Sequence, residues 1–294
     1  MTQPDFREIA ATATVVSLPL RVRFRGITER ESLLFQGPNG WAEWSPFLEY
    51  EDAEARVWLD GALDQAFGPK REVGNVNVNA TLPAVSPERV TEILETFASF
   101  DTVKIKVAEP GQTIEDDLAR VAAVRLTHPT VKIRIDANGG YSVEQALEVA
   151  ERVGELDYFE QPCRTIGELA ELRVKSRGLT RIAADESVRK VEDPMAVVHA
   201  GAADVLVLKA QPLGGVTNAL ALAKECGLPV TVSSALETRI GLQAGFALAT
   251  ALGGNTAHGL GTEAFFVEPE PFGQLASLER RGWWLDRLER VLAI

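Results

Sequence analysis

The sequence predicts an α/β protein whose main part is a closed (β/α) barrel. From about residue 76 onward, short apolar runs alternate with helix-like segments, and at least seven such units follow one another. Strands that alternate with helices are parallel and joined by crossovers, and a long series of these units favours a barrel over an open sheet. Charged or polar residues also end the apolar runs at nearly constant intervals.

The repeating units follow one another in order along the chain. The expected strands are residues 76–82, 103–107, 131–139, 158–162, 181–187, 204–210 and 229–235. The helices expected to follow them are residues 86–100, 113–128, 142–154, 165–178, 193–201, 214–227 and 239–254. Two of these helices begin with the spacing of a capping box, Ser142 with Gln145 and Thr165 with Glu168. In a capping box, the two side chains satisfy free backbone N–H groups at the helix start.

Composition and charge limit the kinds of partner. The 294 residues, 46% of them hydrophobic, suffice for one large α/β domain or for a large domain with a smaller companion. A formal charge of −12 disfavours nucleic acid and anionic membranes as partners. Cys163 and Cys226 lack metal-type spacing, and no targeting or transmembrane segment is visible. We therefore expect a cytoplasmic protein that acts on a small molecule.

Six polar residues mark the carboxyl ends of consecutive expected strands. They are Lys106, Asp136, Glu160, Asp185, Lys209 and Ser233, separated by 30, 24, 25, 24 and 24 residues. A βα unit is about that long, so we expect these residues at the same height, on the barrel face where active sites lie. Strand ends are often polar because they meet water, but charges inside apolar runs are costly to bury without partners or metal. The pattern therefore predicts a functional ring.

Three carboxylates in this ring come from neighbouring strands. Asp136, Glu160 and Asp185 would repel one another and raise one another's pKa unless a cation lay between them. An all-oxygen set suits Mg²⁺, with Mn²⁺ as a substitute, and zinc is disfavoured because no His or Cys joins the set. A structural salt-bridge network with nearby lysines is the alternative at this point.

Lysines flank the carboxylates on both sides. Lys104 and Lys106 alternate within the expected strand 103–107 and therefore share a face, and Lys209 ends the strand on the other side. A partly desolvated lysine beside a divalent cation loses its proton more easily and can act as a base. A carboxylate bound to a metal has a more acidic α-proton, because the ion stabilises the enediolate. The set predicts proton abstraction next to a carboxylate.

These ordered motifs resemble the muconate-lactonizing subgroup of the enolase superfamily. The motifs are K-x-K at Lys104 and Lys106, D-x-N at Asp136 and Asn138, F-E-Q-P at residues 159–162, D-E-S at residues 185–187 and the later Lys209. They span the whole barrel, and their order makes the resemblance specific. The resemblance implies a modified (β/α)7β barrel at residues 76–264. It also implies a small α+β capping domain at residues 1–75, to which a C-terminal segment, residues 265–294, returns.

Within that subgroup, residues 24–35 and 40–50 are most similar to the actinobacterial o-succinylbenzoate synthase family. This similarity implies a Mg²⁺-dependent carbon–oxygen lyase of menaquinone biosynthesis. Such an enzyme would dehydrate 2-succinyl-6-hydroxy-2,4-cyclohexadiene-1-carboxylate to 2-succinylbenzoate through an enediolate. We expect a monomer, although the sequence leaves an oligomer open.

The resemblance also implies a role for each matching residue. The metal ligands would be Asp136, Glu160 and Asp185. Lys106 would remove the α-proton and return it to the departing hydroxide. Lys209 would stabilise the enediolate from the opposite face, and its acid or base role stays open. Lys104 would orient Lys106 and tune its basicity by like-charge repulsion.

Seven further residues are expected to contact the substrate. They are Arg25, Arg134, Asn138, Ser233, Ser234, Gly259 and Gly261. Arg134 and Asn138 lie two residues on either side of Asp136 and so share its face. The serines and glycines leave room for the succinyl arm and offer it hydroxyl or backbone N–H groups. Arg25 lies on an expected capping loop, where it would meet a carboxylate.

Other functions stay open at this point. An N-succinylamino acid racemase, or an enzyme with both activities, would use Lys106 and Lys209 as base and acid on opposite faces. A Schiff-base aldolase would use Lys209 as a nucleophile without a metal. A non-catalytic binding protein would leave the converging lysines and carboxylates unexplained. A dipeptide epimerase is disfavoured, because residues 258–266 lack the Asp-x-Asp of those enzymes.

Overall fold

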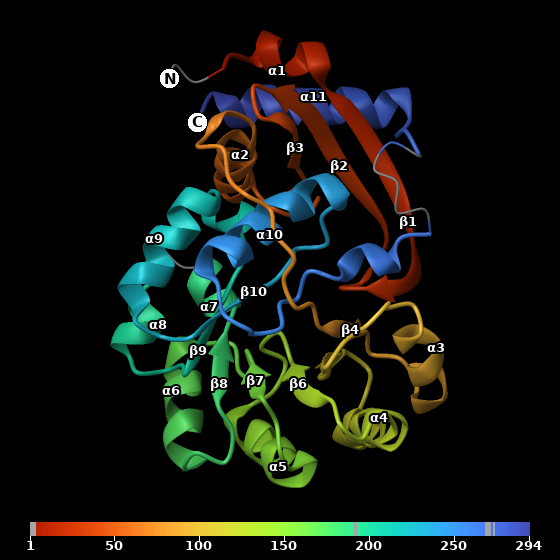
Figure 1. The fold of residues 1–294 in the computed structure, drawn as a ribbon, viewed down its shortest axis with the longest axis vertical. Coiled ribbons are helices and arrows are strands. Elements are labelled where there is room, and N and C mark those ends of the chain that lie inside the picture. Colours follow the sequence, from red (N-terminus) through yellow and green to blue (C-terminus); the bar gives the residue numbers. More distant parts are fainter. Residues whose placement is uncertain (1–3, 191–192, 268–271, 273) are drawn as a thin grey trace.

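The computed structural model describes residues 4–190, 193–267, 272 and 274–294. A body of parallel strands and helices forms one part, and an antiparallel sheet with three helices lies above it in Figure 1. The first and last helices, α1 (Phe6–Thr12) and α11 (Leu278–Leu292), lie together in the upper part. Within the described residues, no helix combines the length and the apolar character needed to cross a membrane.

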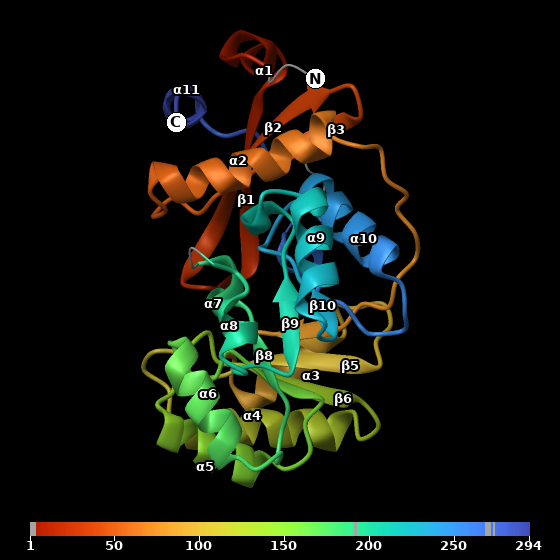
Figure 2. The same ribbon diagram turned by 90° about the vertical axis from the view of Figure 1, so that its left-hand side faces the viewer.

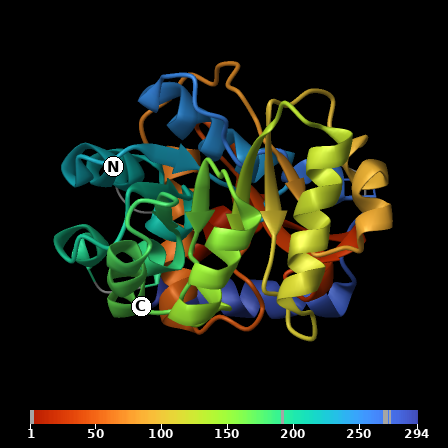
Figure 3. The same cartoon turned by 90° about the horizontal axis from the view of Figure 1, so that it is seen from below.

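The body is built on a seven-stranded parallel sheet in which sequence neighbours are also spatial neighbours. Its strands are β4 (Ala80–Leu82), β5 (Thr102–Lys106), β6 (Lys132–Asp136), β7 (Tyr158–Glu160), β8 (Ile182–Ala184), β9 (Val205–Leu208) and β10 (Val230–Val232). The side of the strands that faces the helices is apolar, because the helices cover this outer face. Figures 2 and 3 show the helices on the outer side of the curled sheet.

Helical segments connect these strands or follow the last of them. They are η1 (Pro87–Arg89), α3 (Val90–Leu94), α4 (Ile114–Thr127), α5 (Val143–Val153), α6 (Ile166–Lys175), α7 (Glu186–Arg189), α8 (Ala196–His199), η2 (Gln211–Leu213), α9 (Val216–Cys226), α10 (Arg239–Leu252) and η3 (Thr262–Phe265). Both expected capping boxes are present, at the starts of α5 and α6. The expected helix 86–100 ends early, at Leu94. Just beyond Leu94, the Thr96 hydroxyl donates to the Ile93 carbonyl at 2.7 Å. This bond competes with the backbone N–H groups that would continue the helix.

A short segment after α10 closes the sheet into a ring. His258 forms a parallel bridge with Val78, just before β4, and Gly259 forms one with Ser233, just after β10. The His258 N–H also donates to the Asn77 carbonyl at 2.7 Å. Seven strands and this bridging segment therefore complete the barrel, and the predicted fold class is confirmed.

The capping part is an antiparallel sheet whose apolar side packs on three helices. The strands are β1 (Thr14–Phe24), β2 (Ile27–Gly37) and β3 (Gly40–Trp44). The helices are α1, α2 (Asp52–Phe67) and α11. Trp44 of β3 meets Trp284 of α11 edge to face, with ring centroids 5.4 Å apart, and both indoles are fully buried. The C-terminal helix is therefore part of this core.

The domain boundaries expected from the sequence, at residues 75 and 264, stay a prediction. Parts of the expected segments, residues 1–3, 268–271 and 273, lie outside the described residues.

Replacing Trp284 by Ala should strongly destabilise the protein. The indole fills the core between β3 and α11, and its Nε1–H donates to Glu31 at 2.7 Å. We expect the free energy of unfolding in urea to fall by about 3–5 kcal/mol. The neighbouring Trp283 is only half-buried and provides a matched control, whose replacement by Ala should cost clearly less. Equal losses at the two positions would contradict this account of the cap.

His258 should make stability depend on pH. Burial, with a smaller effect of Arg134, lowers the pKa of His258 from 6.5 to about 4, and its Nδ1 accepts from the Val232 N–H at 3.0 Å. The unfolded chain therefore takes up the proton first as the pH falls. Stabilisation is complete above pH 6.5 and is lost toward about pH 4, by at most about 3 kcal/mol. His258→Asn keeps an acceptor that does not titrate and should flatten this part of the unfolding curve. An unchanged slope would refute the assignment.

Candidate active site

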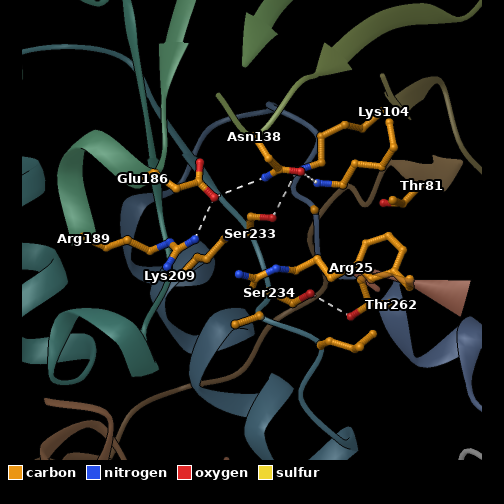
Figure 4. Close-up of a pocket in the computed structure, with 15 residues that line it drawn as sticks. Arg25, Thr81, Lys104, Asn138, Glu186, Arg189, Lys209, Ser233, Ser234 and Thr262 are labelled. Atoms are coloured by element: carbon orange, nitrogen blue, oxygen red, sulfur yellow. Dashed lines mark hydrogen bonds and ion pairs between the residues drawn. The ribbon is translucent and has the colours of Figure 1, made fainter. Parts of the chain in front are cut away.

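A pocket opens at the carboxyl ends of the barrel strands, and Arg25 of the turn between β1 and β2 also lines it (Figure 4). It contains about 440 Å³ of empty space, part of it open to solvent. The cationic residues that line it are Arg25, Lys104, Lys106, Arg189 and Lys209, and the acidic lining residue is Glu186. The surface of the pocket is therefore cationic although the protein as a whole is acidic, which favours an anionic ligand.

The two lysines of β5 both contact carboxylates of the next strands. Lys104 Nζ lies 3.1 Å from both carboxylate oxygens of Glu160 and 3.4 Å from Asp136 Oδ2. Lys106 Nζ lies 2.6 Å from the same Asp136 oxygen and 2.7 Å from Asn138 Oδ1. Asp136 and Glu160 are fully buried, whereas the Lys106 side chain is 13% exposed. Of the two lysines, Lys106 is thus the more accessible from the pocket.

The pKa values of these groups reflect a balance between burial and pairing. Burial alone would raise the pKa of Asp136, but Lys106 and Lys104 outweigh it and hold that pKa well below its usual range. In Glu160, burial and the charge of Asp136 raise the pKa to about 7 in spite of Lys104. Burial would lower the pKa of Lys104, but Glu160 and Asp136 raise it. The neighbouring lysines therefore do not fully offset the cost of a buried negative charge on Glu160.

A second group of charges follows β8. Asp185 is fully buried and contacts Lys209 Nζ through Oδ2 at 2.6 Å and Arg189 Nε through Oδ1 at 2.8 Å. Arg189 also donates to Glu186 Oε1 at 2.8 Å, and the Asn138 amide donates to the same oxygen at 3.2 Å. Figure 4 shows Asn138, Glu186 and Arg189 linked along one side of the pocket. The D-x-N and D-E-S motifs therefore meet in space.

Pairing also decides the ionisation of this second group. Burial would raise the pKa of Asp185, but Arg189 and Lys209 hold it well below its usual range. Burial lowers the pKa of Lys209, and the charge of Asp185 only partly opposes it. Lys209 therefore gives up its proton more easily than a lysine in water.

The strand register refines the expected arrangement of the ring. Lys106 pairs with Asp136, and Asp136 pairs with Glu160, so these three residues are in register. The partner of Glu160 on β8 is Ala183, two residues before Asp185. Strands in a barrel are tilted and staggered, so residues at one mouth need not be in register. Equal spacing along the chain therefore predicted a common mouth but not a common register.

Several residues expected along the succinyl arm lie on the wall after β10. Ser233, Ser234 and Gly259 line the pocket, and Ser233 Oγ lies 3.4 Å from Lys104 Nζ. Ser234 shares a hydrogen bond of 2.7 Å with Thr262, which also lines the pocket (Figure 4). Gly261 lies elsewhere, in an outer groove, where a Cβ would come within 3.1 Å of Phe97. Its position suits close packing rather than substrate contact.

Arg25 lies at the turn between β1 and β2, where it lines the pocket. Its guanidinium lies 4.1 Å from the centre of the Phe47 ring and donates to the Tyr50 hydroxyl at 3.1 Å. A second, outer pocket shares Arg25, Lys106 and Asn138 with the first. Its further cationic residues are Arg21, Arg23 and Arg89. The approach to the candidate site is therefore also cationic.

Arg134 does not line the pocket. It shares a face with Asp136 but lies deeper in the barrel, where it donates to Asp157 at 2.7 Å and to the Ala257 carbonyl at 2.6 Å. Its guanidinium also lies 4.5 Å from the centre of the Tyr158 ring. These contacts join β6 to β7 and to the closing segment, so the geometry favours a structural role over the expected substrate contact.

Sequence reasoning missed Arg189 and Glu186. Glu186 directly follows Asp185 within the D-E-S motif, and Arg189 lies one helical turn after Asp185. The i,i+4 spacing of Asp185 and Arg189 is a recognisable signal for an ion pair. Thr81 and Thr262 also line the pocket, but nothing in their local sequence distinguishes them.

The carboxylates fit a hard divalent cation by their chemistry. Among the residues that the structure describes, no three Asp, Glu, His or Cys side chains are already gathered around one point. Lys104 Nζ instead lies between Glu160 and Asp136. The set formed by Asp136, Glu160 and Asp185 offers only oxygen donors, which hard cations prefer. Burial and the charge of Asp136 raise the pKa of Glu160 in spite of Lys104, so a further positive charge beside it would favour its ionised form.

Two family matches cover most of the chain. A family described as Enolase C-terminal domain-like matches residues 88–275, and one described as Enolase N-terminal domain-like matches residues 15–66. The fold is similar to the L-Ala-D/L-Glu epimerase from Bacillus subtilis, with a TM-score of 0.73 and 21% identity over 87% of this chain and 90% of that chain. It is also similar to the N-succinyl Arg/Lys racemase from Bacillus cereus ATCC 14579, with a TM-score of 0.70 and 19% identity over 87% of each chain. Fold and site together define a capped barrel of the enolase superfamily.

A relative of much higher identity narrows the family. The chain is 49% identical over 304 residues to the o-succinylbenzoate synthase of Mycobacterium ulcerans (strain Agy99), covering 94% of this chain and 91% of the relative. The chain belongs to the o-succinylbenzoate synthase family within the enolase superfamily. The family that the sequence motifs predicted is thereby confirmed.

Proposed function

We propose that this protein dehydrates 2-succinyl-6-hydroxy-2,4-cyclohexadiene-1-carboxylate to 2-succinylbenzoate, as a carbon–oxygen lyase of menaquinone biosynthesis. The observation that carries the proposal is the placement of Lys106 and Lys209 on either side of three buried carboxylates. The 49% identity to a synthase supports the same reaction. Membership of the enolase superfamily also disfavours the Schiff-base aldolase and the non-catalytic binding protein.

We propose Asp136, Glu160 and Asp185 as the ligands of Mg²⁺, for which Mn²⁺ is the substitute. When bound, the ion supplies positive charge that makes the α-proton of a substrate carboxylate more acidic. The three carboxylates come from the ends of adjacent strands, which fixes their order around the barrel mouth. Lys104 pairs with two of them and would hold them in place.

Lys106 would act as the base in its neutral form. Its Nζ reaches the pocket beside Asn138, so it can take the α-proton of the substrate as the C–H bond breaks. The same ammonium would then give this proton to the departing hydroxyl group as the C–O bond breaks. Water leaves, the ring becomes aromatic, and Lys106 returns to its starting state. No oxidant or further reactant is needed.

Lys209 would act from the opposite side of the substrate. Its ammonium is held by Asp185 and can stabilise the negative charge that develops on the substrate when the proton leaves. Its lowered pKa also makes an acid or base role accessible. The succinyl arm would lie along Ser233, Ser234 and Gly259, which form the wall next to Lys104.

N-succinylamino acid racemase activity is the second candidate, alone or beside the first. The same observation favours it, since racemisation needs a base and an acid on opposite faces of one carbon. Lys106 and Lys209 lie on either side of the three carboxylates, which supports this candidate. Which reaction dominates is a question of substrate fit.

Replacing Lys106 by Ala should lower kcat for dehydration by about 10²–10⁴-fold, because the base is lost. The assay uses purified protein with Mg²⁺ and the cyclohexadiene acid, with N-succinyl amino acids tested in parallel. Lys132 is exposed at the amino end of β6 and serves as a control, since Lys132→Ala should leave kcat near normal. Near-normal turnover by Lys106→Ala would refute the assignment. Turnover of N-succinyl amino acids alone would favour the second candidate.

Mg²⁺ should stabilise the folded protein through the three carboxylates. At 100 times Kd, binding adds about 2.7 kcal/mol to the free energy of unfolding, so Tm should rise on addition of Mg²⁺. Asp185→Asn should abolish this rise, and EDTA should stop dehydration by the wild type. Asp204→Asn alters an Asp that pairs with Arg173 away from the pocket, and this variant should keep the rise. A full Mg²⁺-dependent rise in Asp185→Asn would contradict the proposed ligand set.

A further inference from the structure

The loop after β10 forms one wall of the pocket in a conformation that its own sequence does not favour. Ser233, Ser234, Ala235 and Leu236 all line the pocket. Leu236 has a φ of +65° and is 1% exposed. Side chains larger than glycine rarely adopt this left-handed conformation, and it persists only where the surroundings enforce it. Contacts from outside the loop must therefore hold this wall.

Arg30 of β2 supplies such contacts from the capping part. Its Nε donates to the Leu236 carbonyl at 3.1 Å, and its Nη2 lies 3.5 Å from the Ala235 carbonyl oxygen. The same nitrogen donates to the carbonyl of Ser45, which follows β3. The guanidinium lies 4.2 Å from the centre of the Phe47 ring, and the residue is 2% exposed. A planar guanidinium with donors in fixed directions can hold several carbonyl groups at once.

Two buried glutamates hold the other side of the same loop. Glu237 accepts a hydrogen bond from the Ala235 N–H at 2.6 Å. Glu43 of β3 accepts from the Thr238 N–H and hydroxyl, at 3.0 and 2.5 Å. The loop backbone is therefore fixed between acceptors on these glutamates and the donors of Arg30. Arg30 supplies the donors that face the Ala235 and Leu236 carbonyl groups.

The contact of Arg30 with Ser45 also connects the capping sheet with the segment after β9. The Ser45 N–H donates to Gln211 Oε1 at 3.0 Å, and Gln211 lies two residues after Lys209. Arg30 thus connects the capping sheet with the loops after β9 and β10. It does not itself line the pocket.

We propose that Arg30 is a positioning residue that sets the pocket wall at residues 233–236, and through it the affinity for the substrate arm. The proposal rests on the proposed function, because it takes the succinyl arm to lie against this wall. Loss of the guanidinium frees the carbonyl groups of Ala235 and Leu236, and the wall relaxes. Binding of ligands that carry the arm weakens, whereas proton transfer at Lys106 continues.

The experiment compares Arg30→Met and Arg30→Lys with the wild type in the presence of Mg²⁺. In Arg30→Met we expect KM for the cyclohexadiene acid to rise about tenfold while kcat stays within about threefold. The affinity for 2-succinylbenzoate, measured by calorimetry, should fall about tenfold, and that for benzoate, which lacks the arm, should change less than about twofold. Arg30→Lys keeps one donor group and should recover part of the loss.

Leu33→Ala is the matched control for destabilisation, since Leu33 is also buried on β2 but has no hydrogen-bonding side chain. It should lower Tm without a rise in KM. An unchanged KM in folded Arg30→Met, or equal weakening of 2-succinylbenzoate and benzoate, would overturn the proposal. Failure of both Arg30 variants to fold would also overturn it, because Arg30 would then serve folding alone. Absence of wild-type turnover would instead refute the proposed function.

Discussion

The structure depends on the pairing of eight charged side chains at the carboxyl ends of the barrel strands. Four carboxylates and four cations contact one another there, and most are buried. A single buried charge without a partner would cost several kcal/mol, so removing one member leaves another uncompensated. The parallel strands bring these groups to one mouth, and the helices around the barrel fix the strands. The site is thus a property of the whole barrel rather than of any one loop.

Such a network also needs a cover, and the capping part provides it from both ends of the chain. The turn between β1 and β2 places Phe24 and Arg25 over the mouth, where Lys106 Nζ lies 5.6 Å from the centre of the Phe24 ring. The C-terminal helix fixes the sheet that carries this turn through the contact of Trp44 with Trp284. The cover shields the ion pairs in part from water, which strengthens them.

The sequence was most informative where a regular pattern expressed a physical requirement. Constant spacing between charged strand ends predicted the barrel and the common mouth, and the capping boxes predicted two helix starts. Alternation assigned Arg134 to the face of Asp136, but it could not show that Arg134 lies one layer deeper, because alternation specifies a face and not a depth. The contacts of Arg30 with Ala235 and Leu236 join positions about two hundred residues apart. No local pattern records such a contact, since it arises only when the cap docks on the barrel.

The charge count of the site constrains which ligands it can hold together. Four carboxylates and four cations are paired there in two groups, so their formal charge is zero as long as Lys106 carries its proton. A divalent cation alone would leave it positive, and a dicarboxylate alone would leave it negative, whereas both together restore balance. Metal and dianionic substrate should therefore favour each other's binding. N-succinyl amino acids and the cyclohexadiene acid are both dicarboxylates, so charge cannot separate the two candidate reactions. Selectivity must come from the shape of the pocket, and the wall at residues 233–236 is the part of that shape that the capping part controls.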